Sequence, residues 1–139
     1  MTWIIGQSYN GLVRKTAALT LCGALAFGGG LEAIAAEELV TVQLLDDQFL
    51  PEKLRFRSGI AYRLRLENNG THMHEFTAPE FLKAIEVKNP EVLEQGQHEV
   101  LLQPKERKEL VFVARDAGRY PLICADHDWD GMVGEITIE

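Results

Sequence analysis

Alternation of apolar and polar side chains dominates the last hundred positions of the chain. Residues 60–67 (IAYRLRLE) place apolar side chains at every second position, a period of two that is typical of a half-buried β-strand. Residues 53–57 do the same, with Leu54 and Phe56 on the inward face. Five further strands are predicted by the same pattern, at 39–45, 99–103, 108–114, 119–124 and 133–138.

Short turn sequences separate these predicted strands. They are rich in Gly, Asn, Pro and Asp, residues that favour tight turns, and lie at 58–59, 68–70, 103–104 and 116–118. Strands at this spacing predict an all-β fold, either a β-sandwich or a small barrel. The segment from Pro79 to Gln97 interrupts the pattern, and residues 80–84 within it fit either a short helix or an irregular excursion.

The first 35 residues differ from the rest of the chain. Arg14 and Lys15 precede an apolar run of about 12 residues, and a small-residue site at 33–36 follows it, the order of a secretory signal peptide. The run is shorter than the roughly 20 residues that span a bilayer. We expect cleavage after Ala35 or Ala36, which gives a signal peptide at 1–35, a domain at 36–139 and a periplasmic protein without a membrane segment. A retained anchor is the alternative.

Charge narrows the choice of partners. The chain has 14 basic and 21 acidic residues; Arg14, Lys15 and Glu32 lie in the predicted signal peptide. The remaining part therefore carries 12 basic and 20 acidic residues, a net charge of −8. Such a surface repels nucleic acid and anionic membranes, so we expect neither as a partner and favour a basic protein instead.

One cysteine, Cys124, remains after the predicted cleavage, and it opens the stretch CADHDWDGMVG. A single cysteine cannot form an internal disulfide, and a free thiol is a liability in an oxidising compartment. His127 follows three residues after Cys124 and Met132 five residues later. We therefore interpret the stretch as a metal-binding loop.

The donor types indicate which metal the loop suits. Calcium and magnesium prefer oxygen ligands, and structural zinc usually takes two or more cysteines. Two histidines and one cysteine with a weak axial methionine suit copper that cycles between Cu(I) and Cu(II). The loop supplies only one histidine, so the second must come from elsewhere; His72 and His74 are both available upstream.

With these residues the chain resembles the cupredoxins, the type 1 or blue copper proteins. The spacing C-x2-H-x4-M before Val-Gly is similar to the plastocyanin ligand loop, and residues 47–51, 54–59, 68–70 and 74–76 match the family's approach to its first ligand. The resemblance covers 38–139. It implies a Greek-key β-sandwich of about seven or eight strands that binds one copper ion. It also implies the ligands, which are His74, Cys124, His127 and axial Met132.

Several residues depart from the family pattern or leave alternatives open. His72 lies two residues before His74, so in an extended chain both would face the same way. His72 is a ligand, a neighbour of the ligands or a copper-capturing side chain, and we favour His74 as the ligand. Asp126 replaces a proline that is common before the loop histidine. The third departure is the negative charge of Asp126, Asp128 and Asp130, which favours Cu(II) or marks a solvated loop. Glu75 either bonds across to the Cys124 loop or has a surface role. Trp129 is a surface contact or a packed lid, and His98 is structural or exposed.

Two functions fit this pattern. The first is a one-electron carrier that docks with a redox protein, such as a basic cytochrome c or a copper protein. The second is a periplasmic cupredoxin that handles copper in copper tolerance. An enzyme is not expected, because multicopper enzymes need further histidines and Cys124 is flanked by Ile123 and Ala125. We expect a monomer.

Overall fold

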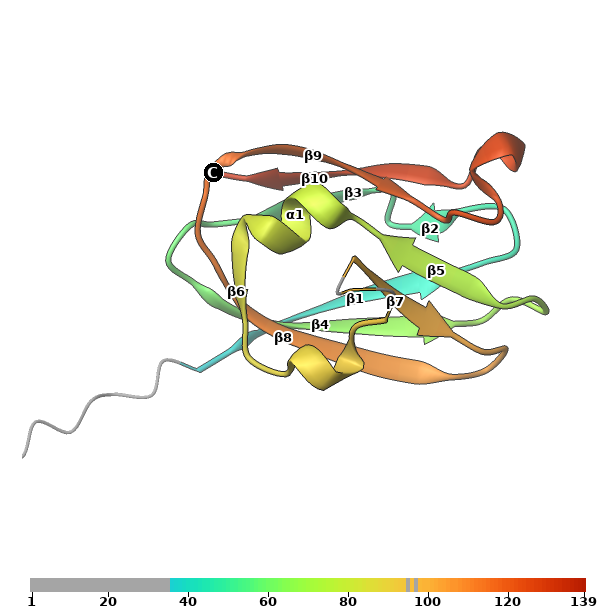
Figure 1. The fold of residues 1–139 in the computed structure, drawn as a ribbon, viewed down its shortest axis with the longest axis horizontal. Helices are drawn as coiled ribbons and strands as arrows, with labels where there is room; N and C mark the ends of the chain where they lie inside the picture. The colour runs from blue at the N-terminus through green and yellow to red at the C-terminus, as the bar shows by residue number, and fades with distance from the viewer. Residues whose placement is uncertain (1–35, 95, 97) are drawn as a thin grey trace, which may run out of the picture. The chain divides into compact units, whose positions relative to one another are not determined.

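The computed structural model describes residues 36–94, 96 and 98–139, so the predicted signal peptide at 1–35 lies outside the described residues. Figure 1 shows two layers of strands, with a short helix at the left. The strands are β1 (Glu38–Leu44), β2 (Phe49–Leu50), β3 (Lys53–Phe56), β4 (Ala61–Asn68), β5 (His74–Thr77), β6 (Ile85–Val87), β7 (Glu99–Leu102), β8 (Arg107–Ala114), β9 (Gly118–Ile123) and β10 (Val133–Ile138). The helix α1 spans Pro79–Lys83, and the 3-10 turns η1 and η2 span Pro90–Val92 and Asp128–Asp130.

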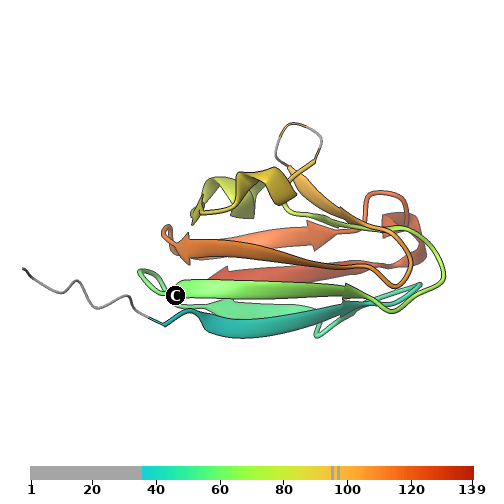
Figure 2. The ribbon, with the colours of Figure 1, turned by 90° about the horizontal axis from the view of Figure 1, so that it is seen from below.

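The strands form two mixed five-stranded sheets. One sheet has the order β2-β1-β4-β8-β6 and the other the order β3-β10-β9-β5-β7. The β1–β4 and β3–β10 pairs are parallel, and the remaining pairs are antiparallel. Figure 2, turned by 90°, shows the strands of both sheets running along the same long axis. The predicted all-β Greek-key sandwich is confirmed.

Three short strands were not predicted from the sequence. The seven predicted strands are all present, but β2, β5 and β6 have only two to four residues each. The burial pattern of β5 does not alternate, because His74, Glu75 and Phe76 are all buried. A strand this short carries too few periods to stand out from a loop. The segment 80–84, left open between helix and loop, lies largely in α1.

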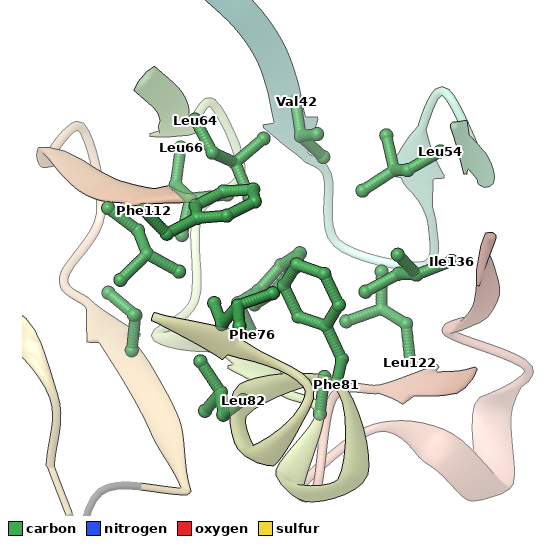
Figure 3. Packing of buried hydrophobic residues seen from close by; sticks show 14 of the residues in the cluster. Val42, Leu54, Leu64, Leu66, Phe76, Phe81, Leu82, Phe112, Leu122 and Ile136 are labelled. Atoms are coloured by element: carbon green, nitrogen blue, oxygen red, sulfur yellow. The ribbon is translucent and has the colours of Figure 1, made fainter. Parts of the chain in front are cut away.

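Apolar side chains at alternate positions of the longer strands fill the interior of the sandwich. In β4, Tyr62, Leu64 and Leu66 are buried and the residues between them are partly exposed. They pack in the cluster shown in Figure 3, where Phe112 of the neighbouring strand β8 and Phe76 and Phe81 lie close to the aliphatic side chains. Burial of such side chains contributes about 1.5–3 kcal/mol each, which makes this core the main source of stability.

Three connections meet at one end of the sandwich, the right-hand end in Figure 1. They are the β1–β2 loop at 45–48, the β4–β5 loop at 69–73 and the β9–β10 loop at 124–132. The predicted metal-binding residues lie on the last two of these connections or next to them. In the part of the chain that the structure describes, no helix is long and apolar enough to cross a membrane.

Candidate metal centre

Residues from two distant segments converge at this end. His74 is the first residue of β5, and Cys124 directly follows β9. Thr77 of β5 pairs with Ile123 of β9, which brings the two segments together. One ligand atom each from His74, Cys124 and His127 lie within 4.8 Å of one another. The sheet pairing therefore brings together three of the four predicted ligands.

The spacing of these atoms suits one ion between them. Cys124 Sγ lies 3.8 Å from His74 Nδ1 and 3.4 Å from His127 Nδ1. Metal bonds of about 2.3 Å to sulfur and about 2.1 Å to nitrogen, at angles near 110–120°, place the two donor atoms about 3.6–3.8 Å apart. Both histidines turn Nδ1 toward the sulfur, so the donor set fits a mononuclear site.

The fourth predicted ligand, Met132, is fixed to the same loop by its backbone. The Met132 amide donates to the carbonyl of His127 at 3.2 Å, and the Met132 carbonyl accepts from the Cys124 amide at 3.1 Å. Its side chain is fully buried. Gly131, just before it, has φ = 96°, a left-handed conformation that glycine adopts without steric cost. The loop is thus closed by its own hydrogen bonds.

Asp46 holds the ring of His74 and was not predicted as part of the site. The Nε2 atom of His74 lies 3.2 Å from Oδ1 of Asp46. A carboxylate only accepts hydrogen bonds, so Nε2 carries the proton and Nδ1 keeps its lone pair toward Cys124. A carboxylate behind a metal-binding histidine fixes the ring orientation and makes the imidazole more basic.

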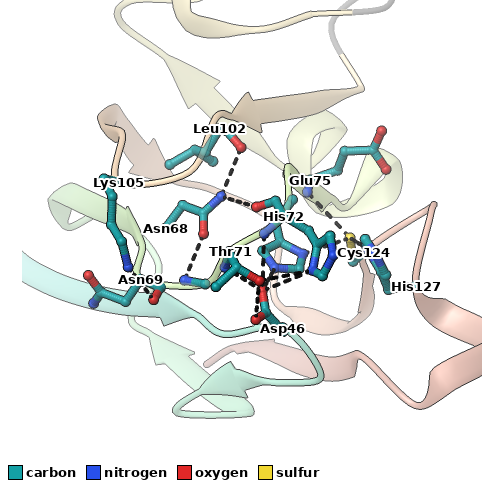
Figure 4. A network of polar contacts seen from close by, with 12 residues as sticks. Asp46, Asn68, Asn69, Thr71, His72, Glu75, Leu102, Lys105, Cys124 and His127 are labelled. Atoms are coloured by element: carbon teal, nitrogen blue, oxygen red, sulfur yellow. Dashed lines mark hydrogen bonds and ion pairs between the residues drawn. The ribbon is translucent and has the colours of Figure 1, made fainter.

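The same carboxylate organises the loop before His74. Asp46 accepts from the Thr71 amide at 2.6 Å, the Thr71 hydroxyl at 2.8 Å and the His72 amide at 3.2 Å. These hydrogen bonds, those of Thr71 first, hold the pKa of Asp46 well below its usual range. Figure 4 shows Asp46, Thr71 and His72 joined in one network. Asp46 is therefore ionised at any pH near neutrality.

Asn68 and Gly70 shape the turn that leads to this network. The buried side chain of Asn68 donates to the carbonyls of His72, at 2.8 Å, and Leu102, at 3.0 Å, and accepts from the Gly70 amide at 3.0 Å. A Cβ atom at Gly70 would lie 2.8 Å from Nε2 of His74 and would also collide with Asp46. Only glycine leaves room here for the contact between the carboxylate and the imidazole.

Glu75 links the strand β5 to the metal-binding loop. Its amide donates to Cys124 Sγ at 3.4 Å, and its side-chain carboxylate accepts from the Asp126 amide at 3.1 Å. The bond across to the loop that the sequence suggested is therefore present. Burial, and next the charge of Asp126, raise the pKa of Glu75. The residue holds the two ligand segments in register.

Burial also sets the protonation of the ligand atoms. Removal from water lowers the pKa of His74, although the Asp46 carboxylate opposes this effect. The imidazole is therefore neutral near pH 7 and able to bind a metal. Burial raises the pKa of the Cys124 thiol, so that metal binding must displace its proton.

The remaining predicted residues lie around the centre. His72 is in the bend before β5 and is exposed, whereas His74 is fully buried, yet both rings lie within 3.4 Å of the same oxygen of Asp46. The strand begins only at His74, and the alternation rule does not extend to the bend. His98 is exposed. The three aspartates Asp126, Asp128 and Asp130 are exposed, and Trp129, 78% exposed, donates to the Asp126 carbonyl at 3.0 Å.

The fold and this donor set define a class of protein, a β-sandwich that binds one copper ion between a loop and a neighbouring strand. The sequence pattern of the cupredoxin-like domain matches residues 16–138. The chain therefore belongs to the cupredoxin-like family, and its cofactor is copper. The predicted signal peptide and domain boundary remain predictions.

Solved structures agree with the fold. Auracyanin B superposes with a TM-score of 0.55 at 17% identity, over 73% of this chain and 88% of that one. A dithionite-reduced auracyanin from the photosynthetic bacterium Roseiflexus castenholzii gives 0.56 at 17% identity, over 75% of this chain and 98% of that one. At this identity the similarity shows the fold alone. No curated protein matches the chain.

Proposed function

We propose that the protein is an exported, periplasmic type 1 copper protein that carries one electron at a time. One observation carries the proposal: His74, Cys124 and Met132 are fully buried, whereas His127 is half-buried and reaches the surface. A buried, preorganised centre with one edge near solvent suits electron exchange, because water stays out and the partner can come close.

The chain supplies geometry, and bound copper supplies the exchangeable electron. His74 and His127 would hold the copper through Nδ1, Cys124 through the sulfur that the Glu75 amide contacts, and Met132 through its thioether. The loop is anchored at both ends by the β9–β10 pair. Its ligands therefore move little when the charge of the centre changes, which lowers the reorganisation cost of transfer.

The partner is proposed from the surface around His127. Asp126, Asp128 and Asp130 surround the exposed Trp129 on the loop that carries the ligands. An aromatic side chain within an acidic rim favours a basic redox protein, such as a cytochrome c or another copper protein. The same charge disfavours nucleic acid and anionic membranes. We propose that the protein acts as a monomer and is not an enzyme.

A second function, copper handling in copper tolerance, is favoured by one observation. His72 places an exposed imidazole directly beside the centre, where a carrier of electrons has no need of one. The two functions make different demands. An electron carrier must keep its copper through many cycles, whereas a copper-handling protein must exchange it.

Spectroscopy and redox titration test the proposal. We expect the protein lacking residues 1–35, loaded with Cu(II), to show strong sulfur-to-copper charge-transfer absorption and reversible one-electron reduction by a basic cytochrome c. The Cys124→Ser variant should lose the absorption. An unchanged spectrum in that variant would refute the site, and loss of copper on each reduction would favour copper handling.

A further inference from the structure

Three imidazoles follow one another from the surface to the interior. The side chain of His72 is 68% exposed, His127 is half-buried, and the side chain of His74 has no exposed surface. The ring centres of His72 and His127 lie 6.1 Å apart, and those of His127 and His74 lie 4.9 Å apart. His127 thus neighbours both an exposed histidine and a buried one.

We propose that His72 and His127 form an entry site at which copper first binds before it reaches the buried ligands. The inference rests on the proposed copper centre and assigns to His72 a role in loading rather than in the finished centre. His72 is not within the cluster formed by His74, Cys124 and His127, so the geometry separates the two roles.

The spacing of the two rings permits one ion between them. A metal–nitrogen bond of about 2.1 Å, together with about 1.1 Å from that nitrogen to the ring centre, puts two rings on one ion at most about 6.4 Å apart. The separation of 6.1 Å between the rings of His72 and His127 falls inside this limit. For an ion to bind there, each ring must direct one nitrogen toward the point between them.

Neighbouring residues hold His72 in position. Its Nδ1 atom lies 3.3 Å from Thr71 Oγ1 and 3.4 Å from Asp46 Oδ1, and its amide also donates to Asp46. These contacts leave Nε2 as the nitrogen available to a metal. The ionised carboxylate of Asp46 adds a negative charge behind the ring, which favours a cation on its outer side.

Transfer from this site to the centre is an exchange of ligands. The bond to His72 breaks as the bond to Cys124 Sγ forms, and the thiol proton passes to water or buffer. His127 remains a ligand throughout, because its Nδ1 atom already lies 3.4 Å from Cys124 Sγ. The oxidation state of copper does not change, so no external oxidant or reductant is required.

The rate of copper loading tests the entry site. Metal-free protein is mixed in a stopped-flow instrument with Cu(II) supplied as its glycine complex, and the charge-transfer absorption is followed in time. We expect His72→Ala to load at least tenfold more slowly than the parent protein and to reach the same final spectrum and reduction potential. His98→Ala, which removes another exposed histidine at the far end of β7, should load at the parent rate.

Each other result contradicts the proposal. Equal loading rates in the parent and His72→Ala proteins would show that His72 has no part in entry, and slow loading in both variants would indicate a general effect of histidine number. An altered final spectrum in His72→Ala would make His72 a ligand of the finished centre. If the parent protein itself never develops the absorption, the proposed copper centre is refuted, and so is the entry site that depends on it. Circular dichroism of the variant checks that the fold is retained.

Discussion

Asp46 couples two histidines of different character. It accepts from His74 Nε2, which is buried, and from the backbone of His72, which is exposed. A single carboxylate therefore fixes the orientation of a proposed ligand and the position of the proposed entry histidine. Because His74 is a neutral imidazole, the negative charge of the Asp46 carboxylate acts mainly by making the His74 ring more basic.

Replacement of Asp46 by Asn should raise the reduction potential of the copper centre. The amide oxygen can still accept from His74, but the negative charge that favours Cu(II) is lost. Each tenfold weakening of Cu(II) binding relative to Cu(I) raises the potential by about 59 mV, and loss of such partners typically weakens metal binding by about 10- to 100-fold. Spectroelectrochemical titration measures the shift.

The neighbouring acid is the matched control for this prediction. Asp47 is also exposed, and Asp47→Asn changes the net charge equally. A shift of similar size in both variants would mean that Asp46 acts through general surface charge and not through His74.

Gly70→Ala should disturb the centre by steric crowding. The added methyl group collides with Asp46 and lies 2.8 Å from His74 Nε2, so the carboxylate or the ring must move. Overpacking of this kind costs about 1–3 kcal/mol. Urea unfolding of the metal-free protein should show this loss, and the charge-transfer band should shift. Asn69→Ala, an exposed neighbour, should change neither; a normal Gly70→Ala protein would contradict the crowding argument.

Single residues differ in how far the sequence alone reveals them. Three of the four proposed ligands share one loop, and their donor types suit one metal, whereas the choice of His74 over His72 came from the family resemblance. Asp46 could not be predicted, since it belongs to a different loop and its acid looks like any solvated turn residue. Its contact with His74 depends on how two loops meet in space, which no local pattern contains.

At the scale of the elements, whether a strand was predicted from the sequence depended on its length. The eight-residue strands β4 and β8 show three or more periods of alternation and were found, whereas the two-residue strand β2 shows none. Pairing order was beyond the sequence pattern, because partners such as β3 and β10 lie at opposite ends of the domain. The family resemblance, rather than periodicity, supplied the Greek key.

Charged side chains reinforce the pairing of β4 with β8. On its outer face, Glu109 accepts from Arg63 at 2.7 Å and from Arg65 at 3.0 Å. These two arginines, Arg63 first, lower the pKa of Glu109. A carboxylate placed between two guanidinium groups across the strands stabilises the sheet modestly, because the side chains remain partly open to solvent.

Glu109→Gln should therefore destabilise the protein in a pH-dependent manner. The pKa of Glu109 is lower in the folded state than its ordinary 4.5, so its contribution is complete above that pH and is lost as the pH falls below it. We expect a loss of about 0.5–1 kcal/mol at pH 7 that shrinks steadily as the pH falls below 4.5. Urea titrations of the metal-free protein across this pH range measure it. Glu91→Gln, on the exposed turn η1, is the control, and a loss that does not shrink on acidification would contradict the ion-pair explanation.

At the scale of the whole molecule, several negatively charged side chains lie at the end of the sandwich that holds the proposed centre. Asp46, Asp47, Asp126, Asp128 and Asp130 all belong to loops at the same end of the sandwich. Exposed Trp129 lies among the last three. The proposed basic partner would thus be attracted toward the end of the molecule that holds the proposed centre.

Removal of two loop charges should slow electron exchange with a basic cytochrome c. We expect Asp128→Asn together with Asp130→Asn to lower the second-order rate about three- to tenfold at low salt, because steering is electrostatic. The difference should fade above about 0.1 M salt, where the screening length is about 10 Å. Stopped-flow measurement across ionic strengths checks both points. Asp116→Asn with Glu91→Gln changes the net charge equally away from the loop, and an equal slowing there would refute local docking.

The parallel pairing of β3 with β10 has a consequence for the order of assembly. β10 is the last strand of the chain, yet it lies between β3 and β9 and anchors the far end of the loop that begins at Cys124. Pairings between strands this far apart in the sequence form slowly, because the entropy of closing a long loop is lost before the new contacts stabilise the chain. The β5–β9 pair already brings Cys124 beside His74, but Met132 directly precedes β10 and can take its place only when the final strand is docked. The complete proposed donor set would therefore form at the end of folding.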